Sequence, residues 1–381
     1  MQGCKRPIGT MRETVGVAVS RLSLERFGPF DEAEFRLTPG VNVVLGANST
    51  GKTFALKALY SVLKGLGEEA RPGVAPRELL RDKLAGVFLP DDGNVRRLVG
   101  RVHGKANGRI GVDFDDSTRS VRATISTGGT QVISSLRFQG EGGARNGSGR
   151  PNLDMPALFL PSREVLAMYE GFVAAYQQRE LSFDETYFDT AVALSAAALR
   201  GPRPGELRRV VERLEKELGG KIRLQGPRFY LKSSRGGKLE AHLLAEGLRK
   251  VASIVHLIAN GALRQGGILI WDEPEANLHP RLAEVVVECL GALAEGGVQV
   301  VVATHDYLIA DAISRWSEYR DVVNRTADVR FFQLRRDKGD AIQVDEADTF
   351  VDLPQNPLLD AFLDHHDREQ QLVARKLTAT R

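Results

Sequence analysis

The sequence contains only two cysteines, Cys4 and Cys289, among its 381 residues. Two cysteines cannot build a disulfide framework, and Cys289 lies in an apolar stretch, so the composition favours a reducing compartment. No run approaches the 18 apolar residues of a membrane-spanning helix, and residues 1–12 lack the apolar core of a signal peptide. We therefore expect a cytoplasmic protein with no membrane partner.

An excess of charge of one sign is also absent, because 52 Lys and Arg residues face 49 Asp and Glu residues, for a net charge of +3. No strong overall field therefore draws the chain toward nucleic acid or a membrane surface. A long heptad run is missing as well, which counts against extended coiled-coil arms. The contents of 42% hydrophobic and 27% charged residues are those of a globular protein.

The most informative segment that is present covers residues 46–53 and fits the pattern G-x-x-x-x-G-K-[ST]. Apolar residues 41–45 lead into it and a helical pattern follows over 52–66, which is the strand, turn and helix that the pattern requires. In that setting backbone N–H groups and the helix N-terminus surround one phosphate, although a turn without a ligand is the alternative. We expect a nucleoside triphosphate site formed by Gly46, Ala47, Asn48, Ser49, Thr50, Gly51, Lys52 and Thr53.

Roles follow for the last two of these residues and for an acidic pair in the second half. Lys52 is expected to reach the β- and γ-phosphates, and the Thr53 hydroxyl to bind Mg²⁺. Residues 267–273 have the pattern of an apolar strand that ends in Asp272 and Glu273. We expect this strand to neighbour the strand at 41–45, which precedes the phosphate-binding loop (P-loop) at 46–53. Asp272 would then hold the metal and Glu273 would polarise the attacking water. Alternatively, the acids before Pro274 simply open a helix.

A third strand pattern, residues 298–303, ends in Thr304, His305 and Asp306. A histidine at that edge can sense the γ-phosphate, whereas a histidine after a strand in isolation is often a surface residue. Its position downstream of the acidic pair favours the catalytic interpretation.

Taken together, the P-loop, residues 272–280 (DEPEANLHP) and the strand-terminal Thr-His-Asp resemble the ATP-binding-cassette (ABC) class of ATPases. The resemblance is to the soluble branch that holds RecF, SMC-type proteins and the overcoming-lysogenization-defect (OLD) ATPases, and it extends from the strand at 17–24 to His305. It implies ATP and Mg²⁺ as cofactors, ATP hydrolysis, and a homodimer of heads around two ATP molecules. In such a dimer the signature segment of each chain closes the partner's site.

Residues 243–250 (LLAEGLRK) stand where that signature belongs, and Ala245, Glu246 and Gly247 replace the usual residues. Ala245 lacks the hydroxyl that commonly touches the γ-phosphate, but free N–H groups at the start of a helix over 246–263 still suit that anion, with Arg249 or Lys250 nearby. An ordinary capped amphipathic helix is the alternative.

A second departure lies at the junction after the strand 157–160, where the Q-loop glutamine of the ABC class is missing. Ser162 or Glu164 would take over contacts to metal or water, or the segment is a plain helix N-cap with a nearby acid. Both interpretations fit the residues equally well.

The expected fold is α/β, a P-loop NTPase of the ABC type with a mixed sheet, an antiparallel β subdomain and a helical lobe. We assign residues 1–14 to a flexible lead, 15–161 and 263–345 to the ATPase lobe, 162–262 to the helical lobe, and 346–381 to an acidic stretch and a C-terminal helix. Strands at 17–24 and 31–37 form a hairpin that brings Arg26 or Phe27 to the adenine. The remaining expected elements are strands at 95–103, 109–114, 119–126, 131–138, 221–224, 228–232, 328–335 and 341–344, helices at 163–178, 185–200, 206–218 and 360–376, and a loop at 140–149.

Two functional classes fit this architecture. The first is an ATPase subunit that regulates a separately encoded effector, as in bacterial anti-phage defence; the second is a RecF-like DNA-binding ATPase of repair, with basic segments 200–209 and 330–338 on the phosphates. A transporter ATPase is a weaker third option. His365, His366 and Asp367 could suggest a metal site, but adjacent histidines face different sides of a helix, which favours a solvated surface. No cluster of acids after His305 indicates an appended nuclease.

Overall fold

The computed structural model describes residues 17–67, 73–100, 104–139, 153, 155–178, 181–199, 205–323, 325–336 and 341–379. The expected lead at 1–14, the loop at 140–149 and parts of both basic segments lie outside these ranges. None of the helices in the described part is long and apolar enough to cross a membrane.

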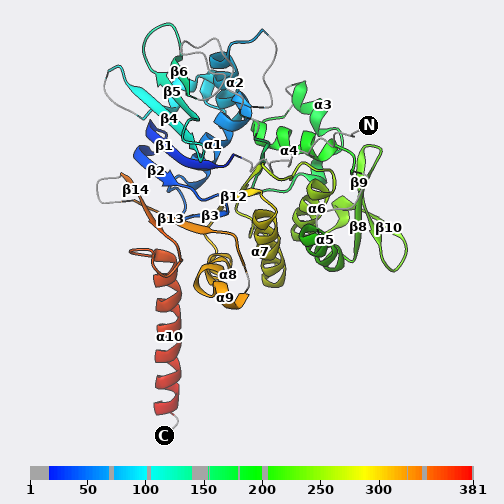
Figure 1. Cartoon of the computed structure of the whole chain (residues 1–381). Helices are drawn as coiled ribbons and strands as arrows, with labels where there is room; N and C mark the ends of the chain where they lie inside the picture. The colour runs from blue at the N-terminus through cyan, green and yellow to red at the C-terminus, as the bar shows by residue number, and fades with distance from the viewer. Residues whose placement is uncertain are drawn as a thin grey trace, which may run out of the picture.

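A six-stranded sheet forms the centre of the molecule, with the strand order β14-β13-β3-β12-β11-β7 (Figure 1). Five of its strands are parallel and the edge strand β14 is antiparallel to β13. The strands are β3 (Val41–Gly46), β7 (Ala157–Leu160), β11 (Ile268–Asp272), β12 (Gln299–Thr304), β13 (Val329–Arg336) and β14 (Ile342–Ala347). Parallel strands covered on both faces read as continuous apolar runs, which is why the sequence shows them clearly.

The order of these strands corrects one expectation. The strand of the acidic pair, β11, does not neighbour the P-loop strand β3, because β12 lies between them and pairs with both. All three strands are parallel, so their carboxyl ends still meet at one edge of the sheet. Asp272 and His305 therefore approach the P-loop from two successive strands.

Side chains alternate across the central sheet and separate two hydrophobic cores. Along β3, Val43 and Leu45 enter one core while Val44 enters the other, and along β11 Leu269 and Ile270 divide in the same way. Each face of the sheet is thus covered by its own set of elements, with the carboxyl edge between them.

An antiparallel sheet and two helices cover the first face. The hairpin β1 and β2 forms as expected, with Phe27 paired to Phe30 across the turn, and the strand order is β2-β1-β4-β5-β6. The elements are β1 (Val19–Phe27), β2 (Phe30–Arg36), α1 (Lys52–Leu66), α2 (Pro76–Phe88), η1 (Asp91–Gly93), η2 (Val95–Leu98), β4 (Asn107–Phe114), β5 (Ser120–Ser126) and β6 (Ile133–Gln139).

Helices and a small three-stranded sheet, ordered β10-β9-β8, cover the second face. The elements are η3 (Leu166–Met168), α3 (Phe172–Gln177), α4 (Glu185–Ser195), α5 (Gly205–Glu217), β8 (Gly220–Gln225), β9 (Arg228–Ser233), β10 (Lys238–Glu240), η4 (Ala241–Leu243), α6 (Glu246–Ala259), α7 (Pro280–Glu295), α8 (Tyr307–Glu318) and α9 (Arg320–Val323). The last helix, α10 (Pro357–Ala379), projects away from the body (Figure 1).

The predicted α/β organisation, with a mixed sheet, an antiparallel subdomain and a helical lobe, is confirmed. Two local predictions are wrong, and one helix was not anticipated. The described part of the expected strand 95–103 is the short helix η2 followed by one bridge from Val99 to Phe27, and the expected helix 163–178 is replaced by η3 and α3. Helix α2 was not predicted; its apolar side chains pack against α1 rather than forming a long stripe.

Candidate functional site

The segment between β3 and α1 is a loop whose backbone wraps around an open centre. Gly46, Ser49 and Gly51 have φ angles of 153°, 65° and 94°, and the Thr50 hydroxyl donates to the carbonyl of Ala47 at 2.8 Å. At Gly51 the positive φ coincides with close packing, because an added Cβ would lie 2.9 Å from Pro29 Cγ. Glycine is therefore required there by conformation and by space.

Lys52, at the start of α1, folds back over this loop. Its ammonium donates to the carbonyls of Gly46 at 2.6 Å and Ala47 at 3.1 Å, and the residue is only 6% exposed. Burial lowers the pKa of Lys52, while the nearby carboxylates of Glu273 and Asp272 oppose that shift. A phosphate in the loop would give this buried cation a stronger partner than two neutral carbonyls.

The next residue, Thr53, meets the acid at the end of β11. Its hydroxyl lies 2.8 Å and 3.1 Å from the two carboxylate oxygens of Asp272, so the two residues expected to bind the metal lie side by side. Burial raises the pKa of Asp272 to about 6, and the bond from Thr53 counteracts it. A buried carboxylate beside a hydroxyl is an oxygen donor set that suits Mg²⁺, which would supply the missing positive charge.

Glu273 begins the turn after β11 in a left-handed conformation, with φ of 49°. Non-glycine residues adopt this region only when neighbours hold them there, and functional sites are enriched in it. Two hydrogen bonds fix this backbone: the Glu273 N–H donates to Ala303 at 2.8 Å, and the ammonium of Lys250 donates to the Glu273 carbonyl at 3.1 Å. The side chain is consequently directed to the P-loop cavity, which it helps to line.

His305 follows β12 and lies beside two carboxylates. Its Nδ1 is 3.5 Å from Glu273 Oε1 and 3.4 Å from Glu275 Oε1, and its backbone N–H donates to Glu275 at 3.0 Å. Burial raises the pKa of Glu275, whose Oε2 has no hydrogen-bond partner among the described residues. Glu275 therefore fixes the histidine loop, a role that its place in the DEPEANLHP segment had not disclosed.

A cavity of about 520 Å³ opens above the P-loop. One end is polar and the other is bounded by Pro29, Phe54 and Phe88. The adenine role expected for Phe27 is wrong, because Phe27 is fully buried and packs against the rings of Phe54 and Phe88. The described lining residues are Pro29, Asn48, Ser49, Thr50, Gly51, Lys52, Thr53, Phe54, Lys57, Phe88 and Glu273.

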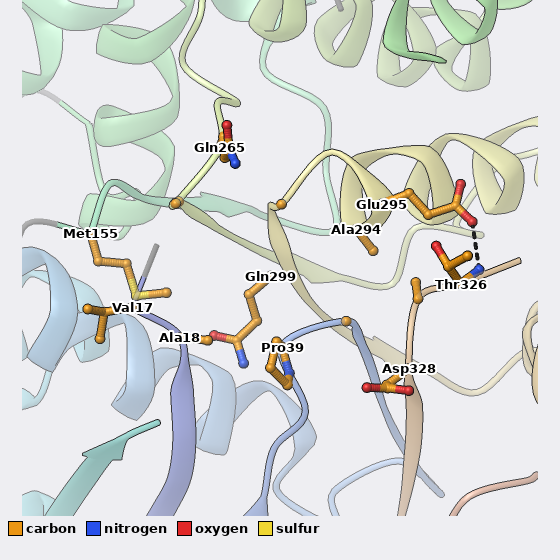
Figure 2. A pocket seen from close by; sticks show the side chains of 15 residues that line it. Val17, Ala18, Pro39, Met155, Gln265, Ala294, Glu295, Gln299, Thr326 and Asp328 are labelled. Carbon is orange, nitrogen blue, oxygen red and sulfur yellow. Dashed lines mark hydrogen bonds between the residues drawn. The ribbon is translucent and has the colours of Figure 1, made fainter. Parts of the chain in front are cut away.

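A larger cavity, of about 570 Å³, lies at the opposite end of the central strands (Figure 2). Its walls include Pro39, Gln299 and Asp328, where β3, β12 and β13 begin. Its acid Glu295 already accepts from the Arg325 guanidinium at 2.7 Å and from the Thr326 N–H at 3.1 Å. The residues predicted to bind and hydrolyse the nucleotide lie at the other edge of the sheet. The larger cavity volume therefore does not identify the functional site here.

The signature segment is not part of the P-loop cavity of its own chain. Ala245 is exposed at the N-cap of α6, whereas Gly247 is buried, and a Cβ there would lie 2.6 Å from the carbonyl of Asn277. The structure therefore places Ala245 at the surface and gives Gly247 a packing role against the turn that follows Glu273. Ala245, Glu246 and Gly247 are not among the residues that line the cavity.

At the junction without a glutamine, the structure favours the capping alternative for Glu164. One carboxylate oxygen accepts from the N–H of Ala167 at 3.1 Å and the other accepts from the Arg249 guanidinium at 2.6 Å. Arg249 also donates to the carbonyls of His242 and Leu244, just before the signature. Glu164 thus braces the signature segment rather than facing the cavity.

Three further contacts escaped the sequence patterns. Lys250 reaches Glu273, as described above; Lys57 pairs with Asp184 at 2.8 Å and ties α1 to α4. The Arg336 guanidinium donates to the P-loop carbonyl of Ser49 at 2.9 Å. No local signal could have found these contacts, because each joins residues far apart in the chain.

Two alternative sites from the sequence find no support. Described members of the basic segment 330–338 pair with the acidic stretch, since Arg330 meets Asp348 at 2.9 Å and Arg335 meets Asp345 at 2.5 Å. His365 and His366 are exposed on α10, and no group of metal-ligating side chains forms among the described residues.

Two family models match the chain, and each matched segment contains part of this site. The model described as "AAA domain" matches residues 17–102, which include the P-loop. The model described as "AAA domain, putative AbiEii toxin, Type IV TA system" matches residues 145–311, which include the signature, the acidic pair and His305.

Curated relatives match over short segments. The DNA replication and repair protein RecF of Edwardsiella ictaluri is 37% identical over 87 residues, 22% of this chain and 24% of the relative. A "Putative ABC transporter ATP-binding protein" of Streptomyces coelicolor is 40% identical over 77 residues, 20% of this chain and 25% of the relative. The matched segments thus span a minor part of either relative.

Solved structures match over most of the chain at low identity. The SMC head domain from Thermotoga maritima is 14% identical, with a TM-score of 0.45, and the match covers 86% of this chain and 98% of that one. An Smc head domain with an extended coiled coil, bound to the C-terminal domain of ScpA derived from Pyrococcus furiosus, is 11% identical, with a TM-score of 0.48 and coverages of 87% and 96%.

Proposed function

Because this chain is a P-loop ATPase of the ABC class, similar to RecF over part of its length, we propose that it binds and hydrolyses ATP in a two-fold dimer and thereby controls a separately encoded effector. The observation that carries this proposal is the meeting of Thr53, Asp272 and Glu273 at the P-loop cavity. A hydroxyl and a carboxylate suited to Mg²⁺ stand beside a second carboxylate suited to water.

Binding begins with the groups that the loop already presents. On arrival of a triphosphate, Lys52 exchanges its two carbonyl partners for phosphate oxygens, and the loop N–H groups surround the β-phosphate. Thr53 and Asp272 would hold Mg²⁺, which would neutralise charge on the phosphates. The apolar end formed by Phe54 and Phe88 is the surface that a base can cover.

Hydrolysis then depends on Glu273. Its carboxylate orients a water and accepts a proton from it as the water oxygen attacks the γ-phosphorus, and the bond to the β–γ bridging oxygen breaks. The products are ADP and inorganic phosphate. His305, 3.5 Å from Glu273, holds that carboxylate in place and contacts the γ-phosphate.

Dimerisation is supported by the position of the signature. The exposed N-terminus of α6 offers free N–H groups, yet it does not line the cavity of its own chain. A second copy arranged head-to-tail brings this helix end to the γ-phosphate, and two-fold symmetry makes two identical sites.

The effector part of the proposal is supported by the family model over residues 145–311, which is named after a toxin of a toxin–antitoxin system. Such an association favours a protein that works with a separately encoded partner in bacterial defence. The test is co-expression with the neighbouring open reading frames, followed by purification of this chain as wild type and as Lys52→Ala. A partner that binds the wild type but not Lys52→Ala supports the proposal. Its absence from both preparations, while the wild type retains ATPase activity, contradicts the effector part alone.

A second function, DNA binding of the RecF kind, is favoured by one surface. On the outer face of the three-stranded sheet, Lys221, Lys232 and Lys238 stand directly opposite one another across β8, β9 and β10. Like charges in such a row cost stability, so packing does not account for them. Lys221 has a distant acid, Glu215 at 3.7 Å, and Lys238 lies over the ring of Tyr230 at 3.4 Å.

This lysine row fits a polyanion with regularly spaced charges, and the exposed Arg223 extends it. Binding of duplex DNA over a salt series tests the idea, because each phosphate contact adds about 0.9 to the slope of log K against log salt. The Lys221→Glu/Lys232→Glu/Lys238→Glu variant should reduce that slope by about 2–3. The matched control Lys105→Glu/Lys216→Glu removes exposed lysines elsewhere and should leave the slope nearly unchanged; equal losses in both variants would contradict a dedicated surface.

A further inference from the structure

Helix α10 is the one element in the described part that stands clear of the body along most of its length (Figure 1). Its attachment is confined to its first turns, where Phe362 stacks on Tyr307 with ring centroids 4.2 Å apart. Phe362 itself remains 48% exposed, and beyond this contact Leu363, Leu372 and Val373 are 50%, 64% and 48% exposed. An apolar stripe on an otherwise solvated helix indicates a partner surface.

Two of these exposed residues, Leu363 and Val373, lie on a face of the helix that has the spacing of a coiled-coil seam. Leu359, Leu363, His366, Gln370 and Val373 follow one another at intervals of four, three, four and three residues, and the sequence carries another leucine at 377. Alternating steps of three and four place residues on one narrow face of a helix. The residue types are also symmetric about position 368: Leu363 and Val373 are apolar, and His366 and Gln370 between them are polar.

This symmetry specifies an antiparallel arrangement. When two copies of α10 run in opposite directions about position 368, Leu363 of one copy meets Val373 of the other, and His366 meets Gln370. The imidazole and the amide are complementary in hydrogen bonding, whereas a parallel pair would set His366 against its own copy. Polar layers of this kind define register and orientation in coiled coils.

Charge along the helix favours the same direction. Asp360, Asp364 and Asp367 lie in its first half, while Arg375 and Lys376 lie near its end. A parallel pair would stack the acidic halves on each other, and an antiparallel pair sets them against the basic ends. The helix has 23 residues, about 34 Å at 1.5 Å per residue, so antiparallel copies hold the two bodies at opposite ends.

We propose that α10 is an interaction surface for a second copy of this chain, paired antiparallel through Leu363, His366, Gln370 and Val373. The pair is separate from the ATP-dependent interface and needs no nucleotide. It joins one ATPase dimer to the next. Near the two-fold axis Asp367 and Glu369 face their own copies, which limits the affinity, so the pair forms at raised local concentration rather than as a permanent dimer.

Cysteine cross-linking tests both the contact and its direction. The experiment uses the full chain carrying Cys4→Ser and Lys52→Ala, without nucleotide, so that failure of the ATP-dependent dimer cannot affect the result; Cys289 is fully buried. The double variant Leu363→Cys/Val373→Cys should give a disulfide-linked dimer on mild oxidation. Either single variant should give little, because its thiols lie about 15 Å apart along an antiparallel pair.

The matched control is His365→Cys/Gln371→Cys, which has the same symmetry about position 368 but lies on the opposite side of the helix. It should remain monomeric under the same conditions. Equal cross-linking by the control or by the single variants would overturn the proposal, the latter by showing a parallel pair. A double variant that stays monomeric at high protein concentration, with its melting temperature unchanged, would overturn it as well.

Discussion

Asp272 shows how one buried side chain combines a structural cost with a functional gain. It is 6% exposed, its carboxylate accepts a hydrogen bond from the Thr53 hydroxyl, and burial raises the pKa of its carboxyl from 3.8 to about 6. Without a cation, the ionised carboxylate therefore destabilises the fold. A group that is costly in the free protein and suited to a metal ion is typical of a site built for its ligand.

The first prediction concerns the effect of Asp272 on the stability of the protein. Because the folded pKa of Asp272 lies above its unfolded value, the stability of the nucleotide-free protein falls as the pH rises from about 4 to about 6. Asp272→Asn removes the charge and should raise the free energy of unfolding by about 1–3 kcal/mol at pH 7.5. Thermal melts at a series of pH values measure this difference. The stability advantage of Asp272→Asn over the wild type should narrow as the pH falls from 6 toward 4. The same variant should lose Mg²⁺-dependent hydrolysis, and a variant less stable than wild type at pH 7.5 would contradict the argument.

The second prediction concerns the base. Glu273→Gln keeps the shape of the side chain and removes proton acceptance, so ATP hydrolysis should fall about 10²–10⁴-fold while ATP still binds. Turnover and equilibrium binding of labelled ATP, measured on the same preparation, separate the two effects. Lys52→Ala serves as the contrasting variant, because it should weaken binding itself. Hydrolysis at the wild-type rate by Glu273→Gln would assign the base elsewhere.

At the scale of the element, helix α6 links two parts of the site that the sequence treats separately. The signature lies at its N-terminal end, where Ala245 is exposed, and one turn later the buried Lys250 donates to the carbonyl of Glu273. Arg249, between them, joins the signature to Glu164. A displacement of this helix would therefore act directly on the strained backbone of Glu273.

The third prediction tests this link. Lys250→Met keeps the length and the apolar contacts of the side chain but removes the hydrogen bond that holds Glu273 in its left-handed conformation. We expect kcat to fall about 10-fold or more, since a positioning contact of roughly 1.4 kcal/mol corresponds to that factor, while KM changes little. Steady-state kinetics measure the split, and Lys216→Met, at an exposed lysine of α5, is the matched control. A change in KM alone would place Lys250 in substrate binding instead.

At the scale of the whole molecule, the signature residues Ala245, Glu246 and Gly247 do not line the P-loop cavity of their own chain. The carboxyl edge of the central sheet carries Lys52, Asp272 and His305, whereas Ala245 is exposed at the start of α6. In the proposed dimer a second subunit joins these segments around one nucleotide, so ATP should shift the population toward a dimer.

The fourth prediction is that the side chain at one exposed position, Ala245, determines whether ATP drives dimerisation. Gly247 is unsuitable for the test, because any side chain there would strike Asn277. Ala245→Asp and Ala245→Ser both provide a better N-cap than alanine, and each should stabilise α6 by about 0.5–2 kcal/mol. Only the aspartate puts a negative charge against the partner's γ-phosphate, so it should abolish ATP-dependent dimerisation in the Glu273→Gln background, and the serine should preserve it.

Analytical ultracentrifugation with and without ATP measures this difference. The α10 pair is nucleotide-independent, so the signal is the increase caused by ATP rather than the mass itself. Equal behaviour of the two variants would mean that the signature does not meet a phosphate across the dimer.

The sequence by itself determined the features whose physics is local. The P-loop is contiguous, α1 occupies the expected residues, and buried strands such as β7 and β11 appear as short apolar runs because both of their faces are covered. Asp272 and His305 could be assigned because they follow such strands, whose parallel ends share an edge. The antiparallel hairpin at Phe27 was equally readable from its turn.

Only the tertiary structure decided the contacts between distant residues. It inserted β12 between the P-loop strand and β11, buried Phe27 instead of turning it to the adenine, and gave Glu164 to Arg249. It also aligned Lys221, Lys232 and Lys238, which no linear pattern marks as a group, and placed Lys250 under Glu273. Periodicity reports which face of an element is buried, but the choice of neighbour follows from packing and long-range strand pairing, to which every element contributes at once.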